Sequence, residues 1–178
     1  MSFVASANCI LYCNGTVDLL DIDQNTLNIE PQGLEKYFQS NDPDIIIPVH
    51  FGGLASDSEK IRKIAGKKII IEDASHSLGG KYSNGKSVGS CCYSDLTVFS
   101  FHPVKSITTG EGGAILTNNP KLAKQLMVLR AHGIEKERDN LKVEISQLGE
   151  NSPWLYDQRT LGFNYRMTEL QAALGLNQ

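Results

Sequence analysis

The stretch TVFSFHPVKSITTGEGG, residues 97–113, places one lysine, Lys105, after an apolar run and before a cluster of glycines. β-branched and aromatic residues at 97–101 are typical of a strand, and Pro103 ends it because proline cannot donate a hydrogen bond to a sheet. A second strand is predicted at 114–117. A lysine enclosed between two strands loses part of its hydration, as a lysine that forms Schiff bases requires. The alternative interpretation is an ordinary surface lysine in a hairpin.

A βαβ unit is predicted upstream of this stretch. Residues 45–49 and 68–71 are continuous apolar runs, and a predicted helix at 56–66 lies between them. Strand, helix and strand at these lengths indicate an α/β fold with a mainly parallel sheet and helices on both faces. Ligands in such sheets collect at the carboxyl ends of the strands. Asp73, which follows the second run, is therefore a candidate site residue by position alone.

Other segments show helical periodicity, strand composition or polar character. The predicted helices are at 2–13, packed on one face, and at 31–38, 120–132 and 167–176, with a strand at 16–22 and a polar surface excursion at 79–93. Residues 135–151 are charged and have little periodicity, which predicts an exposed, mobile loop. The length predicts a single domain over residues 1–178.

The composition excludes several function classes. With 40% hydrophobic and 21% charged residues the chain is typical of a globular protein. A net charge of −3 without a basic run argues against nucleic-acid and anionic-membrane binding. No apolar stretch has membrane-spanning length and there is no secretory signal, so we expect a cytoplasmic protein. The four cysteines have no CxxC spacing and no zinc pattern, which predicts reduced, partly buried thiols and no metal site.

Five ordered motifs carry a family resemblance. They are IEDASH (71–76), FSFHPVK (99–105), TGEGG (109–113), LRAHG (129–133) and LGFNYR (161–166). Together they resemble the DegT/StrS family of pyridoxal-phosphate-dependent nucleotide-sugar aminotransferases, and the second and fifth are most similar to its pseudaminic-acid branch. The resemblance implies a fold-type I large domain and pyridoxal 5'-phosphate as the cofactor. It also implies that glutamate donates an amino group to the 4-keto group of a nucleotide-linked 4-keto-6-deoxy sugar, with UDP as the nucleotide.

The resemblance implies roles for five residues. Lys105 would hold the cofactor as a Schiff base and move a proton between the substrate and cofactor carbons. Asp73 would keep the ring nitrogen protonated, and His76 would bond the phenolic oxygen of the ring. Ser100 would bond the cofactor phosphate. Asn164 would reach the phosphate of a neighbouring subunit, which implies a homodimer with shared sites.

Each of these residues also has a structural interpretation. Asp73 is then a cap at a strand end, His76 a satisfied histidine in a turn, and Ser100 a strand residue. Asn164 then serves a turn. The role of Glu111, in the glycine-rich motif, stays open, because carboxylates also cap such turns.

The chain departs from the family pattern at both ends. Family members are longer, and their N-terminal part supplies a Gly-Thr phosphate-binding turn and an aromatic residue that stacks on the ring. Here Gly15-Thr16 opens a predicted strand instead. We therefore expect an incomplete large domain without the C-terminal small domain. The alternatives are an inactive remnant, a non-enzymatic interaction module, and a keto-sugar dehydratase relative, against which Lys105 argues because those relatives carry histidine there.

Overall fold

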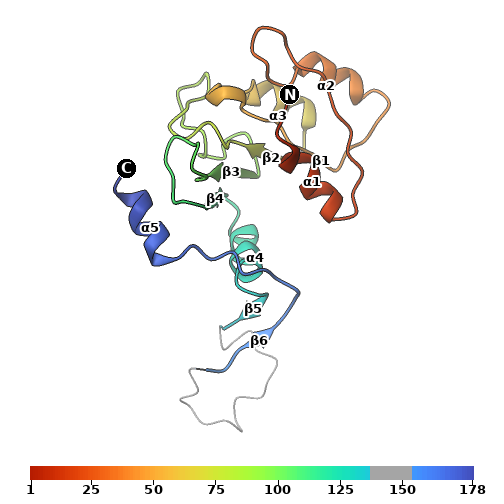
Figure 1. Cartoon of the computed structure of the whole chain (residues 1–178). Coiled ribbons are helices and arrows are strands. Elements are labelled where there is room, and N and C mark those ends of the chain that lie inside the picture. Colours follow the sequence, from red (N-terminus) through yellow and green to blue (C-terminus); the bar gives the residue numbers. More distant parts are fainter. Residues whose placement is uncertain (137–153) are drawn as a thin grey trace. The chain divides into compact units, whose positions relative to one another are not determined.

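The computed structural model describes residues 1–136 and 154–178, which form two compact units (Figure 1). Unit 1 comprises residues 1–118 and 169–178, and unit 2 comprises the described part of residues 119–168. The loop predicted at 135–151 lies, from residue 137 on, outside the described residues. In the described part of the chain, no helix has the length and apolar character needed to cross a membrane.

A four-stranded sheet forms the centre of unit 1. Its strands, in spatial order, are β1 (Ile45–Ile46), β2 (Ile69–Asp73), β3 (Leu96–Ser100) and β4 (Gly113–Leu116). β1, β2 and β3 are parallel, whereas β4 returns antiparallel to β3. The α/β fold with a mainly parallel sheet, predicted from the sequence, is confirmed.

β1 is shorter than the predicted strand at 45–49. Pro48 has no N–H to donate, so the regular ladder stops before it. The chain nevertheless continues beside β2, since the Asp73 N–H donates to the Pro48 carbonyl at 2.9 Å and the His50 N–H donates to the Asp73 carbonyl at 3.0 Å. The segment that leaves β1 is therefore fixed beside Asp73, the last residue of β2.

The helices of unit 1 begin and end close to the predicted positions. They are α1 (Val4–Tyr12), α2 (Pro31–Tyr37), α3 (Ser58–Ala65) and α5 (Glu169–Leu176), with a short 3-10 turn at Phe51–Gly53. Asp57 caps α3 by accepting from the Lys60 N–H at 3.2 Å. α3 packs against α2 and β2 around an apolar core of Leu34, Ile46, Ile61, Ala65 and Ile70.

Three expectations about the first half of the chain are wrong. The strand predicted at 16–22 does not form, and an isolated bridge joins Ile22 to Ile29 instead. The chain turns back between them because the Asp23 carboxylate accepts hydrogen bonds from the N–H groups of Asn25 and Thr26. The helix α1 has no buried residue on any face. The polar segment at 79–93 is not purely a surface excursion, since Tyr82 and Val88 are buried in a second apolar cluster with Ala74 and Phe99.

The cysteines are all free thiols. Cys9 and Cys13 are exposed, whereas Cys91 is buried and Cys92 is partly buried. The expectation of reduced thiols therefore agrees with the structure, but the expected partial burial does not hold for the two cysteines at α1.

Unit 2 consists of the helix α4 (Pro120–Leu129) and the antiparallel pair β5 (Ile134–Glu135) and β6 (Asp157–Gln158). α4 ends three residues before the predicted limit, because His132 and Gly133 both adopt positive φ. A Cβ atom on Gly133 would lie 1.8 Å from the Thr160 carbonyl oxygen, so this turn admits only glycine.

The buried face of β2 makes a testable contribution to stability. Ile70 is 1% exposed and its neighbour Ile69 is 45% exposed, although both lie on the same strand. We expect Ile70→Ala to lower the free energy of unfolding by about 2–5 kcal/mol, because the cavity left in the core cannot close fully. Urea denaturation measures this, with Ile69→Ala as the matched control, and equal losses for the two variants would contradict the assignment of faces.

Candidate functional site

Four of the five predicted site residues lie at the carboxyl edge of β2 and β3. Asp73 ends β2 opposite Val98, and Ser100 ends β3. His76 follows β2 in an exposed turn, and Lys105 lies, partly exposed, in the loop after β3. Because the two strands are parallel, their carboxyl ends meet at one edge of the sheet. The predicted site residues thus come from two paired strands that the whole 79–93 segment separates in the sequence.

Both carboxylate oxygens of Asp73 are hydrogen-bonded. Oδ1 accepts from the Ser75 hydroxyl at 2.7 Å and from the Ser75 N–H at 3.2 Å. Oδ2 accepts from the hydroxyl of Ser6, on α1, at 2.5 Å. The half-buried carboxylate is therefore held from two sides. The contact with Ser6 was not predicted from the sequence.

The loop that carries Lys105 is closed at its base. The Phe101 N–H donates to the Gly112 carbonyl at 2.8 Å, and the Thr109 N–H donates to the Phe101 carbonyl at 3.0 Å. Inside the loop, the Lys105 N–H donates to the His102 carbonyl at 2.9 Å. The ends of the loop are thus fixed to the sheet, and Lys105 lies in a turn between them.

Gly113 permits the close approach of β4 to β3. A Cβ atom there would lie 2.6 Å from the Phe99 carbonyl oxygen, which real Cβ atoms do not tolerate. The glycine-rich motif therefore has a structural reason as well as the functional one expected from the sequence.

Glu111 contributes to this loop through its backbone. Its carbonyl accepts from the Thr109 hydroxyl at 2.7 Å and from the Gln171 side-chain amide, on α5, at 2.9 Å. Its exposed carboxylate lies 4.0 Å from the His102 imidazole. These contacts favour the structural role that the sequence left open.

Asn164 lies in unit 2. It is exposed, and its backbone pairs with Ala131 as an isolated antiparallel bridge. The rings of Phe163 and Tyr165, on either side of it in the sequence, stack at 4.8 Å with an interplanar angle of 10°. The backbone at Asn164 is therefore held by the bridge to Ala131, and its two neighbours pack against each other.

A buried carboxylate, Glu72, lies one residue before Asp73 and was missed by the sequence analysis. Its side chain is fully inaccessible. Four hydroxyl groups at 2.7–2.8 Å donate to it: Ser58 to Oε1, and Tyr82, Ser94 and Thr97 to Oε2. The alternation of β2 was the available signal, because Glu72 shares the buried face with Ile70.

His50 completes this buried cluster. Its Nδ1 accepts from the Ser56 N–H at 3.1 Å, which leaves the ring proton on Nε2. Nε2 lies 3.5 Å from Glu72 Oε1 and makes no hydrogen bond within the part of the chain that the structure describes. The four hydroxyl groups therefore bind the carboxylate more closely than the imidazole does.

The electrostatics of Glu72 follow from these contacts. Burial raises the pKa of a carboxyl group, but the neighbouring His50 imidazole and the hydrogen bonds from Tyr82 and Ser58 act in the opposite direction and lower the pKa of Glu72 from 4.5 to about 2. Burial and the contact with Glu72 raise the pKa of the Tyr82 phenol far above its ordinary value. The carboxylate is therefore ionised, and the phenol protonated, across the physiological range.

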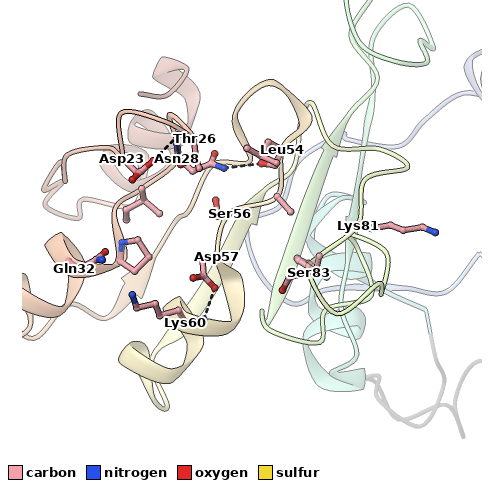
Figure 2. A pocket seen from close by; sticks show the side chains of 14 residues that line it. Asp23, Thr26, Asn28, Gln32, Leu54, Ser56, Asp57, Lys60, Lys81 and Ser83 are labelled. Atoms are coloured by element: carbon pink, nitrogen blue, oxygen red, sulfur yellow. Dashed lines mark hydrogen bonds between the residues drawn. The ribbon is translucent and has the colours of Figure 1, made fainter.

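A cavity of about 590 Å³ lies in unit 1 between the 23–32 segment, the start of α3 and the 81–83 turn (Figure 2). The side-chain amide of Asn28 makes structural hydrogen bonds, since it donates to the Leu54 carbonyl at 3.0 Å and accepts from the Phe51 N–H at 2.8 Å. No predicted site residue lines this cavity. Within the described residues there is likewise no cluster of acidic, histidine or cysteine side chains that could hold a metal ion.

The model of the DegT/DnrJ/EryC1/StrS aminotransferase family matches residues 1–178. The chain belongs to this family. The family predicted from the five motifs is confirmed, and with it the α/β fold of its members.

Relatives of this family match the whole chain but only part of their own length. The chain is 42% identical over 182 residues to the UDP-4-amino-4,6-dideoxy-N-acetyl-beta-L-altrosamine transaminase of Campylobacter jejuni. The matched region covers 100% of the chain and 44% of that protein. The structure of Helicobacter pylori PseC, an aminotransferase involved in pseudoaminic acid biosynthesis, matches with a TM-score of 0.82 and 34% identity over 99% of the chain and 43% of PseC. The narrower resemblance to the pseudaminic-acid branch is thus also confirmed.

A structure of NtdA from Bacillus subtilis contains bound cofactor PMP, the amino form of pyridoxal phosphate. It matches with a TM-score of 0.77 and 34% identity over 98% of the chain and 36% of NtdA. The family and its cofactor-bound members confirm the cofactor predicted from the sequence, pyridoxal phosphate. The chain spans less than half the length of these relatives.

The buried carboxylate predicts how stability depends on pH. Because the pKa of Glu72 is lowered in the fold, its contribution is complete above about pH 4.5 and is lost as the pH falls through about 2. That contribution is about 3 kcal/mol. Glu72→Gln should therefore lower the free energy of unfolding at pH 7 and flatten its decline between pH 4.5 and 2.

Urea denaturation at several pH values measures this, and Glu35→Gln, on the exposed surface of α2, is the control. A Glu72→Gln variant with the same acid profile as the unchanged chain would contradict the account of the buried cluster.

Proposed function

We propose that this chain carries the cofactor lysine of a pyridoxal-phosphate-dependent nucleotide-sugar aminotransferase. In the proposed reaction, glutamate supplies an amino group to the 4-keto group of a nucleotide-linked 4-keto-6-deoxy sugar, with UDP as the nucleotide. The observation that carries the proposal is the gathering of Lys105, Asp73 and Ser100 at one edge of the sheet in a member of an aminotransferase family.

The chemistry of these residues fits the cofactor. An amine suits an aldehyde, a carboxylate suits a protonated ring nitrogen, and a hydroxyl group suits a phosphate. When bound, the cofactor supplies an electron sink for the substrate carbon. The carboxylate of Asp73 is already held from two sides, so little ordering remains before it accepts a hydrogen bond.

Each residue has a distinct task in the proposal. Lys105 would hold the cofactor aldehyde through Nζ and would take up and return a proton at the same atom. Asp73 holds the proton on the ring nitrogen. Ser100 donates to the phosphate, and His76 donates to the phenolic oxygen.

The proposal extends to the assembly and to unit 2. Asn164 bonds the phosphate in a second subunit, so the protein is a homodimer with shared sites. The two units belong to one large domain, and the protein works in the cytoplasm without nucleic acid or membrane as a partner. The match of the family model along residues 1–178 supports these proposals.

Removing the amine of Lys105 tests the covalent site. We expect the unchanged chain with added pyridoxal phosphate to give a visible absorbance band, and borohydride reduction to leave the label on Lys105. Lys105→Ala should lose both the band and the labelled peptide, because no amine remains at the loop to bind the aldehyde. Peptide mapping by mass spectrometry measures the result.

Lys86→Ala, in an exposed turn, is the matched control and should keep the label on Lys105. Retention of the label in Lys105→Ala would defeat the assignment. An unchanged chain that takes up no label would show that it does not bind the cofactor and would favour the inactive alternative.

The charge of Asp73 is a second test. Asp73→Asn keeps the shape of the side chain but removes the charge opposite the ring nitrogen, so we expect the glutamate half-reaction to slow by about 100-fold or more. The absorbance change of the loaded chain on adding glutamate measures this rate. Urea denaturation should show a much smaller effect on folding, and an unchanged rate would remove Asp73 from the proposed role.

A further inference from the structure

A single hydroxyl group ties the helix α1 to the candidate site. Ser6 donates to Asp73 Oδ2 at 2.5 Å, a contact that joins positions 67 residues apart in the sequence. No residue of α1 is buried, so apolar packing does not account for the place of this helix beside β2. The sequence motifs give Ser6 no role.

The contact acts on a part of Asp73 that local structure leaves free to turn. Ser75, two residues further on, donates to Oδ1 through both its hydroxyl and its N–H group. The terminal torsion of an aspartate is broad, so a carboxylate bonded at one oxygen still rotates about that contact. A donor on Oδ2 from a different element fixes the plane of the carboxylate.

We propose that Ser6 is a positioning residue that sets the plane of the Asp73 carboxylate for the cofactor ring nitrogen. The proposal rests on the proposed function, in which that nitrogen binds Asp73. Each carboxylate oxygen accepts more than one hydrogen bond, so the Ser6 hydroxyl and the ring N–H are compatible on the same group. Loss of Ser6 leaves the charge of Asp73 in place but releases its orientation.

Three variants of the full chain separate this role from a merely structural one. Ser6→Ala removes the hydroxyl, and Ser6→Thr retains one. Ser2→Ala is the matched control, because the Ser2 hydroxyl donates only locally, to the Phe3 carbonyl at 3.0 Å. Urea denaturation verifies that each variant folds.

Two readouts report on the carboxylate itself. The first is the carboxyl ¹³C signal of Asp73 in the cofactor-free chain, assigned by its loss in Asp73→Asn. The second is the dissociation constant for pyridoxal phosphate, from titration of the visible band. Ser6→Ala should shift the carboxyl signal and weaken cofactor binding by roughly tenfold, since the lost hydrogen bond is to a charged group. Ser6→Thr should restore both values, and Ser2→Ala should leave both unchanged.

The outcomes distinguish the two levels of the account. If Ser6→Ala leaves the carboxyl signal and the dissociation constant unchanged while Asp73→Asn weakens binding, the positioning role is overturned and the proposed function stands. If the unchanged chain binds no pyridoxal phosphate, or if Asp73→Asn binds it equally well, the proposed use of Asp73 fails and the role of Ser6 fails with it.

Discussion

The ionised carboxylate of Glu72, fully buried in unit 1, is the constraint on which the rest of that unit depends. A charge removed from water is tolerated only when hydrogen bonds replace its hydration, and here four hydroxyl groups do so. These groups come from α3, from the 82–94 segment and from β3. The carboxylate therefore joins parts of the chain that apolar contacts alone would leave less precisely placed.

This constraint also fixes the candidate site. Glu72 and Asp73 are consecutive residues of β2, and successive side chains of a strand point to opposite faces. Glu72 faces the buried cluster, whereas Asp73 is half-buried and receives Ser6 and Ser75. Anchoring the first residue leaves the second little freedom at the strand end. The loop with Lys105 has a comparable anchor, since its base is hydrogen-bonded next to β3 and β4.

The local part of this arrangement was predictable from the sequence. Lys105 was predicted as a site residue from a strand, a proline and a group of glycines around it, and Asp73 from its place after a buried run. Both depend on short segments whose chemistry is visible in the chain. The contacts of Ser6 and Tyr82 were not predictable in this way, because each bonds a carboxylate on another segment, 67 residues away for Ser6 and 10 residues away for Tyr82. The polar composition around Tyr82 hid a buried phenol, and residues 16–22 have strand composition but no neighbouring strand to pair with.

The most direct test of the central claim is the position of pyridoxal phosphate in a crystal structure of the chain grown with it. The account predicts a covalent link to Lys105 Nζ and the ring nitrogen within hydrogen-bond distance of the Asp73 carboxylate. Cofactor linked to another lysine, or lying in the cavity beside Asn28 and Lys60, would contradict it.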